Sequence, residues 1–250
     1  MKPYAIVAEG PEDTAALRGL FRDAGGQVEG GGIHDSHRSP LAIRLDGELV
    51  QIWSAQGKAR LTERTIFAAQ GTASYRPEIV VVCFDPDADD EPGEFAFFAS
   101  AFEAVRGDRA GPISFEGGVA TFRIGDRAVR LLPAPWRHDA PASHASLPDE
   151  QNLERLLITG VLRADSSRTL IPWATKATAD LLPLVEGHGW KRAFRIWNAA
   201  LEPKSEAFVD ALLQHDAKDH CLAALRESRA WKTISTLHDA RDVPSPIEGG

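Results

Sequence analysis

The order of apolar and polar residues near the N-terminus predicts a strand followed by a helix. Tyr4 to Ala8 form a short continuous apolar run, as expected for a parallel strand that is covered on both faces. From Thr14 onward the apolar residues fall at i, i+3, i+4 and i+7, which is one face of a helix; they are Leu17, Leu20, Phe21 and Ala24. Gly25 and Gly26 then end the predicted helix.

Two hairpins and a second buried strand are predicted next. Residues 41–53 read as two extended runs around Asp46 and Gly47, a strong signal for a tight turn. Residues 119–136 read as another strand pair that turns at Gly125 and Asp126. Between the two hairpins, a turn and a helix precede Ile79 to Phe84, a run of six apolar residues that is typical of a buried strand.

Helical periodicity returns after this strand. Phe98, Phe102 and Val105 mark one amphipathic helix, and from Gln151 nearly to the end the pattern is helical. Strands that alternate with helices and are followed by a helical run indicate an α/β fold. We therefore expect a small, mostly parallel sheet flanked by helices, with β-hairpin insertions and a helical C-terminal part.

Composition narrows the class of protein. The 250 residues are 43% hydrophobic and 26% charged, as in soluble globular proteins. No apolar run approaches the roughly 18 residues of a membrane span, so we expect a cytoplasmic protein without membrane contact. Cys83 and Cys221 fit reduced core thiols better than a disulfide. The net charge of −8 argues against a protein that coats nucleic acid, but not against a nuclease that handles phosphates through metal ions.

Acidic residues gather where the two buried strands end. Glu9 follows the first strand directly, and the second strand runs into five carboxylates, which are Asp85, Asp87, Asp89, Asp90 and Glu91. Functional residues of open parallel sheets lie at the carboxyl ends of the strands. If the two strands are neighbours, Glu9 and Asp85 converge on one crevice.

The spacing of these acids predicts a divalent cation. Asp85, Asp87 and Asp89 are two residues apart, so an extended loop projects them to one side. Like charges about 4 Å apart repel by about 4 kcal/mol at the effective dielectric near a protein surface. Mg²⁺ (or Mn²⁺) relieves this repulsion, because it takes oxygen ligands from one or two carboxylates together with water and phosphate. The plainer interpretation is a solvated turn, and Asp13 similarly reads as the N-cap of the helix from Thr14.

The same residues resemble the Toprim domain, the catalytic module of topoisomerases, primases and the overcoming-lysogenization-defect nucleases. Members of that family are similar in having a Glu after the first strand, matched by Glu9, and an Asp-x-Asp after a later strand, matched by Asp85 and Asp87. Their Gly-Lys and Leu-Glu positions are matched by Gly57 and Lys58 and by Leu153 and Glu154. The resemblance covers residues 3–165 and is closest to small stand-alone Toprim-like proteins and the nuclease branch.

The resemblance implies a Toprim-like α/β domain over residues 1–165. Residues 166–250 are not covered by it, and their helical pattern predicts a C-terminal extension packed on this domain. The resemblance also implies a Mg²⁺-dependent nuclease that cleaves DNA or RNA. Asp85, Asp87 and Asp89 would hold one or two metal ions, and Glu154 would complete a second metal site. Glu9 would bind a metal or act as general acid/base. Lys58 would neutralise the scissile phosphate, with Arg60 or Lys176 as helpers.

Other activities fit the sequence less well. The two tyrosines, Tyr4 and Tyr75, stand in no separate domain of the kind that a topoisomerase needs, and 250 residues cannot hold the template and nucleotide domains of a primase. Because the chain lacks a Gly-x-x-x-x-Gly-Lys-Ser/Thr loop, an ATPase, where one is used, would be a separate protein.

Two further interpretations stay open. His34 and His37, with Asp35, are a second candidate metal site, although a pair of histidines in a Gly-rich loop is more often plain loop. The alternative to an enzyme is a non-enzymatic cation-binding adaptor, or a module that binds nucleic acid or protein on a Toprim-like scaffold. Residues 190–197, "WKRAFRIW", would then dock the partner.

Overall fold

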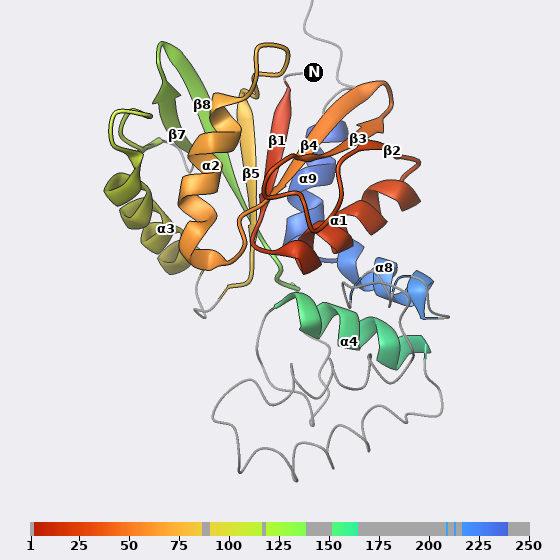
Figure 1. Cartoon of the computed structure of the whole chain (residues 1–250). Coiled ribbons are helices and arrows are strands. Elements are labelled where there is room, and N and C mark those ends of the chain that lie inside the picture. Colours follow the sequence, from red (N-terminus) through yellow and green to blue (C-terminus); the bar gives the residue numbers. More distant parts are fainter. Residues whose placement is uncertain are drawn as a thin grey trace, which may run out of the picture.

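The computed structural model describes residues 3–86, 91–116, 119–138, 152–164, 209, 213 and 217–239. Its strands form one eight-stranded sheet in the order β2-β3-β4-β1-β5-β8-β7-β6 (Figure 1). The strands are β1 Tyr4–Ala8, β2 Gln27–Gly30, β3 Leu41–Leu45, β4 Glu48–Ser54, β5 Ile79–Phe84, β6 Ser114–Glu116, β7 Val119–Ile124 and β8 Arg127–Pro135. The helices are α1 Pro11–Asp23, the 3₁₀ turn η1 Lys58–Arg60, α2 Leu61–Gln70, α3 Glu91–Arg106, α4 Leu153–Ala164, α8 Lys218–Arg226 and α9 Arg229–Asp239.

The centre of the sheet is parallel. β1 lies between β4 and β5, and β5 pairs in turn with β8, all in the same direction. The prediction that the first strand and the most apolar strand are neighbours is therefore confirmed. Every residue of β1 and β5 is buried, because helices cover both faces of the sheet at this position.

Antiparallel hairpins extend this centre on both sides. The β3–β4 hairpin turns at Asp46 and Gly47, whose φ angles are 51° and 82°, and such positive values favour glycine and asparagine or aspartate. The β7–β8 hairpin turns at Gly125 and Asp126 as predicted. The pattern did not predict β2, a short exposed edge strand that owes its conformation to pairing with β3. The expected α/β class, with hairpins added to a parallel centre and helices on its faces, is confirmed.

Two hydrophobic clusters hold the helices on the sheet. The first lies between one face of the sheet and helices α1, α4, α8 and α9, and it contains Ile6, Phe21 and Trp136. The second lies between the other face and helices α2 and α3, and it contains Val7 and Phe102. This alternation along β1 is the side-chain period of two that strands impose.

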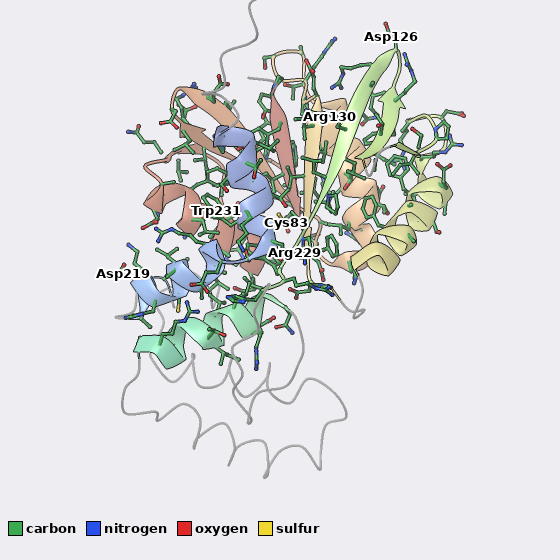
Figure 2. The ribbon with its side chains drawn as sticks, turned by 180° about the vertical axis from the view of Figure 1, so that it is seen from behind. Cys83, Asp126, Arg130, Asp219, Arg229 and Trp231 are labelled. Atoms are coloured by element: carbon green, nitrogen blue, oxygen red, sulfur yellow. The ribbon has the colours of Figure 1, made fainter. Side chains whose placement is uncertain are left out.

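Helices from the C-terminal part belong to the first cluster. Cys221 and Ile234, from α8 and α9, are fully buried there, and Figure 2 shows α9 lying across the back of the sheet. Trp231 of α9 packs edge-on against Phe21 of α1, with 5.3 Å between the ring centroids. Gly160 lets α4 approach α8 closely, because a Cβ at this position would lie 2.5 Å from the Cα of Cys221. The division into residues 1–165 and 166–250 stays a prediction.

Both cysteines are buried free thiols, as the sequence predicts. Burial raises the pKa of Cys221 to about 12, and it also raises the pKa of Cys83, which suits inert core residues. Among the helices that the structure describes, none is long and apolar enough to cross a membrane.

Candidate functional site

Glu9 and Asp85 meet at the carboxyl edge of the parallel centre. The β1–β5 register places Ala8 beside Cys83, so the chain leaves both strands at nearly the same level. The backbone N–H of Asp85 donates a hydrogen bond to Oε2 of Glu9 at 3.3 Å. In Figure 1 this edge is the lower end of β1 and β5, where α1 and α4 begin.

Lys58 reaches the same edge from the next strand. After β4, the backbone N–H groups of Ala55 and Gly57 donate to the carbonyl oxygens of Ala8 and Glu9, at 2.9 and 2.7 Å. The chain can follow β1 in this way because Gly57 adopts a φ of 112°, which disfavours other residues. The Nζ of Lys58 then donates to the carbonyl oxygen of Asp85 at 3.2 Å. The positively charged ammonium group of Lys58 therefore lies beside the two acids.

Helix α4 begins against the Asp85 carboxylate. The backbone N–H of Leu153 donates to Oδ1 of Asp85 at 2.8 Å, and Oδ1 of Asn152 accepts from the N–H of Arg155 at 2.9 Å. These contacts satisfy two of the N–H groups that a helix leaves open at its start. The partial positive charge at this helix terminus also stabilises a carboxylate. Glu154, the next residue, is buried, with 4% of its surface exposed.

Asp13 is a further member of the acidic cluster. The prediction that Asp13 is the N-cap of a helix from Thr14 is wrong: α1 begins at Pro11 with Gly10 as N-cap, and Oδ2 of Asp13 accepts a hydrogen bond from the Gly10 N–H at 3.0 Å. The other carboxylate oxygen, Oδ1, accepts a hydrogen bond from the indole Nε1 of Trp136 at 2.6 Å.

The environment of Asp13 favours its protonated form. Burial raises the pKa of Asp13 well above its ordinary value, and the charges of Asp85 and Glu9, and to a smaller extent Glu154, raise it further. The hydrogen bond from Trp136 acts in the opposite direction. This mutual influence places four carboxyl groups, those of Glu9, Asp13, Asp85 and Glu154, in one neighbourhood.

Several predicted site residues fall outside the described part of the chain. They are Asp87, Asp89, Lys176 and residues 190–197. Within the described residues, no group of three or more His, Cys, Asp or Glu side chains is arranged to hold a metal ion. His34 and His37 therefore belong to no such group in the part of the chain that the structure describes, and Nδ1 of His37 lies 2.9 Å from the carbonyl oxygen of His34.

A basic and aromatic surface beside the site was missed in the sequence. The guanidinium carbon of Arg64 lies 5.1 Å from the ring centroid of Phe67 and 5.8 Å from that of Trp53, within the range of cation–π contacts. Trp53 pairs with Val7 in the sheet, two residues before the level of Glu9. Phe67 is 47% exposed. The signal was present in the sequence, since Arg60, Arg64 and Phe67 follow helical spacing.

Comparisons with known proteins bear on the fold. No protein-family model matches the chain, and no curated protein matches it. Among solved structures, the chain is similar to the crystal structure of hypothetical protein PH0156 from Pyrococcus horikoshii OT3, with a TM-score of 0.58 and 15% sequence identity. The match covers 95% of this chain and 100% of the other. At this identity the likeness concerns the α/β fold alone.

Proposed function

We propose that this protein is a Toprim-like, Mg²⁺-dependent nuclease that cleaves phosphodiester bonds in DNA or RNA. The observation that carries the proposal is the contact between Glu9 and the Asp85 backbone at the carboxyl edge of two buried parallel strands. Sites in open α/β sheets form at this edge. A lone solvated turn after β5 accounts for neither the Glu9 contact nor the buried carboxyl groups next to it.

The donor set suits a hard cation. Carboxylate oxygens from Glu9 and Asp85 are the kind of ligand that Mg²⁺ takes, one or two at a time, and water and substrate phosphate complete its coordination. When bound, Mg²⁺ supplies neutralising charge to the phosphate and lowers the pKa of an attacking water. Asp87, Asp89 and Glu154 are the further ligands that the proposal assigns.

The remaining residues would act on the substrate and on protons. Lys58 binds the scissile phosphate, because its ammonium group already lies at the acidic edge through its contact with the Asp85 carbonyl. The Glu9 carboxylate serves either as a metal ligand or as the group that takes the proton of the attacking water.

The surface around Arg64 supports a nucleic acid as the substrate. An exposed aromatic ring beside a guanidinium group can stack on bases of any sequence. Arg60, directly before α2, is also exposed. The positive charge is local, which reconciles binding of a polyanion with the net charge of −8.

A specific observation favours the alternative, a non-enzymatic adaptor that binds a cation, nucleic acid or protein on the same scaffold. The carboxylate of Asp85 already has a structural task, since it accepts the Leu153 N–H at the start of α4. In this interpretation the acids fix the junction of sheet and helix, and a bound cation would only reinforce it.

Cleavage assays on matched variants separate the two proposals. Plasmid DNA, single-stranded DNA and RNA are incubated with the protein in Mg²⁺, in Mn²⁺ and in a chelator. The nuclease proposal expects metal-dependent products, and it expects Glu9→Gln and the pair Asp85→Asn with Asp87→Ala to abolish them, while Asp46→Asn, in the distant β3–β4 turn, cleaves normally. Asp85→Asn keeps an oxygen that can accept the Leu153 N–H, so this variant should keep the fold. Circular dichroism checks that it does, and a loss of cleavage can then be assigned to the site. Intact substrate under every condition favours the adaptor.

A further inference from the structure

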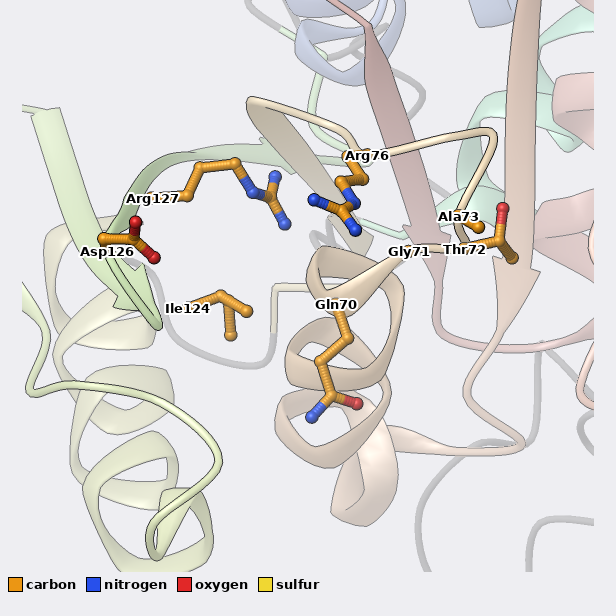
Figure 3. Close-up of a pocket in the computed structure, with 8 residues that line it drawn as sticks. All are labelled: Gln70, Gly71, Thr72, Ala73, Arg76, Ile124, Asp126 and Arg127. Carbon is orange, nitrogen blue, oxygen red and sulfur yellow. The ribbon is translucent and has the colours of Figure 1, made fainter.

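A pocket of about 570 Å³ lies at the edge of the sheet opposite the acidic cluster. It opens between the β7–β8 turn and the loop that connects α2 to β5, so it stands at the amino ends of β5 and β8 (Figure 3). β5 has six residues, which corresponds to about 20 Å at 3.3 Å per residue. Most of the side chains that line the pocket are polar or charged; they are Gln70, Thr72, Arg76, Asp126 and Arg127.

Two guanidinium groups face each other across this pocket. Figure 3 shows Arg127, from the start of β8, and Arg76, from the loop before β5, pointing toward one another. Burial lowers the pKa of Arg127, and the positive charge of Arg76 lowers it further, which is the electrostatic consequence of this approach. Glu78 acts on Arg127 in the opposite direction, but more weakly than Arg76 does.

Arg127 is held in place by the backbone. Its two terminal nitrogens donate to the carbonyl oxygens of Pro77 and Ala69. Ala69 belongs to the last turn of α2, so the guanidinium group covers the carbonyl end of that helix, which would otherwise repel an anion. A guanidinium group has five N–H donors, and these two bonds leave others for a ligand.

Carboxylates of the described residues act on the two guanidinium groups only from beyond ion-pair distance. Within the described residues, neither Arg76 nor Arg127 forms an ion pair with an acidic side chain at 4.0 Å or less. Asp126 also lines the pocket, but Figure 3 shows its carboxylate on the far side of the pocket from Arg76. Two like charges are therefore brought together at the mouth of a cavity, and an anion placed between them would offset their repulsion.

We propose that the pocket between Arg76 and Arg127 binds the phosphate group of a small phosphate ester. A phosphate carries a charge of about −1.5 to −2 near neutral pH, which matches two guanidinium groups, and its oxygens pair with their N–H donors. The cavity is larger than a phosphate ion requires. Gln70 and Ile124 offer an amide and an apolar contact to the remainder of the ester. The site lies away from the acidic cluster and does not depend on a nuclease activity.

An NMR titration of the full chain tests the proposal. Inorganic phosphate and adenosine monophosphate are the probes, with acetate at equal ionic strength as the control for carboxylates. We expect saturable shifts of the Thr72 and Arg127 amide signals with both phosphates, tighter binding of the ester, and little response to acetate. Arg76→Ala removes an exposed guanidinium group whose loss should leave the fold intact, and it should weaken binding about tenfold or more.

Two further variants test whether the charge of the pocket determines its affinity for phosphate. Asp126→Asn removes the one carboxylate among the described residues that line the pocket, and it should tighten phosphate binding. Arg130→Ala removes the same charge from β8 without touching the pocket, so its affinity should equal that of the wild type. The proposal is overturned if the wild type shows no saturable shifts, or if Arg76→Ala and Arg130→Ala weaken phosphate binding equally.

Discussion

The backbone N–H of Asp85 donates to the side chain of Glu9, so the two acids that end β1 and β5 are joined by the protein itself. This bond uses the amide rather than the carboxylate of Asp85. A substitution of the Asp85 side chain therefore leaves the support of Glu9 in place. A substitution that removes Oδ1 of Asp85, such as Asp85→Ala, does disturb α4, because this oxygen accepts the Leu153 N–H. Glu9→Gln therefore tests the acidic site, whereas substitutions of Asp85 test the acidic site and the start of α4 together.

Divalent metal should stabilise the protein through Glu9 and Asp85. A ligand at about 100 times its Kd adds about 2.7 kcal/mol to the free energy of unfolding, which for a chain of this size raises Tm by roughly 5 to 10 °C. We expect such a rise with Mg²⁺ or Mn²⁺ for the wild type in a thermal melt. Glu9→Gln should abolish most of the rise, since it removes one charge of the cluster while keeping the shape of the side chain.

The matched control for this measurement is Asp46→Asn. It removes one negative charge at the exposed β3–β4 turn, where asparagine accepts the positive φ as well as aspartate does. Its melting temperature should respond to metal as the wild type does. An equal metal response in Glu9→Gln would show that the cation binds elsewhere and would remove the support for metal at this edge.

Lys58 should matter for catalysis more than for stability. It is only partly buried and donates to the neutral carbonyl of Asp85, a kind of bond that typically contributes about 1 kcal/mol, so we expect Lys58→Ala to lower the free energy of unfolding only modestly. Loss of a positive group that meets charge developing on a phosphate typically lowers kcat by about 10² to 10³. We expect this loss in single-turnover cleavage, with partial recovery in Lys58→Arg. Lys218→Ala, on α8, removes the same charge at an exposed position and should cleave at the wild-type rate; an unchanged rate in Lys58→Ala would contradict the assigned role.

Asp13 should make the protein more stable as the pH falls from 7 toward 4. Its pKa in the folded state is raised, chiefly by burial, so between pH about 4 and the raised value the folded protein holds a proton that the unfolded chain has lost. Stability in that window decreases as the pH rises. Asp13→Asn cannot titrate, so the difference in free energy of unfolding between wild type and variant should shift in favour of the wild type on acidification. Urea unfolding at a series of pH values measures it, and a difference independent of pH would contradict the prediction.

Sequence reasoning succeeded where a single local pattern determines the outcome. The continuous apolar runs of β1 and β5 identify strands that are buried on both faces, and the rule that sites form at the carboxyl ends of such strands leads directly to Glu9 and Asp85. Asp46 and Gly47 likewise determine their own turn through the positive φ angles that they tolerate. The exposed strand β2 carries no such pattern, because its conformation depends on its partner β3.

The role of Asp13 required contacts that no local pattern contains. The indole that donates to it belongs to Trp136, 123 residues later in the chain, and only the tertiary fold brings the residue after β8 beside α1. Part of the error was avoidable, since Pro11 is a residue favoured at the first position of a helix and places Asp13 at the third. The contact between Asp85 and the start of α4 spans 68 residues of sequence, so the structural task of that carboxylate could not be anticipated either.

Glu227 should hold the C-terminal helices on the rest of the protein through its contacts to Arg163 and His138. It lies between α8 and α9, its carboxylate makes a two-bond contact to Arg163 of α4 at 2.9 and 2.8 Å, and one of its oxygens lies 2.7 Å from Nε2 of His138 just after β8. The bonds from Arg163 and then from His138 lower the pKa of Glu227 to about 2. Its stabilising effect is therefore complete above the ordinary value near 4.5 and is lost as the pH falls through about 2.

We expect Glu227→Gln to lower the free energy of unfolding at pH 7 by about 1 kcal/mol or less, because the Glu227 side chain is 42% exposed and solvent screens the pair. The more sensitive measurement is amide hydrogen exchange. Loss of the Glu227 contacts should raise the exchange rate of backbone amides in α9 while the amides of β1 and β5 stay protected. The control is Glu29→Gln, which breaks the pair with Arg44 between the neighbouring strands β2 and β3 and should leave α9 exchange unchanged. Equal exchange in α9 for Glu227→Gln and the wild type would show that apolar packing of Trp231 and Ile234 alone holds the helix.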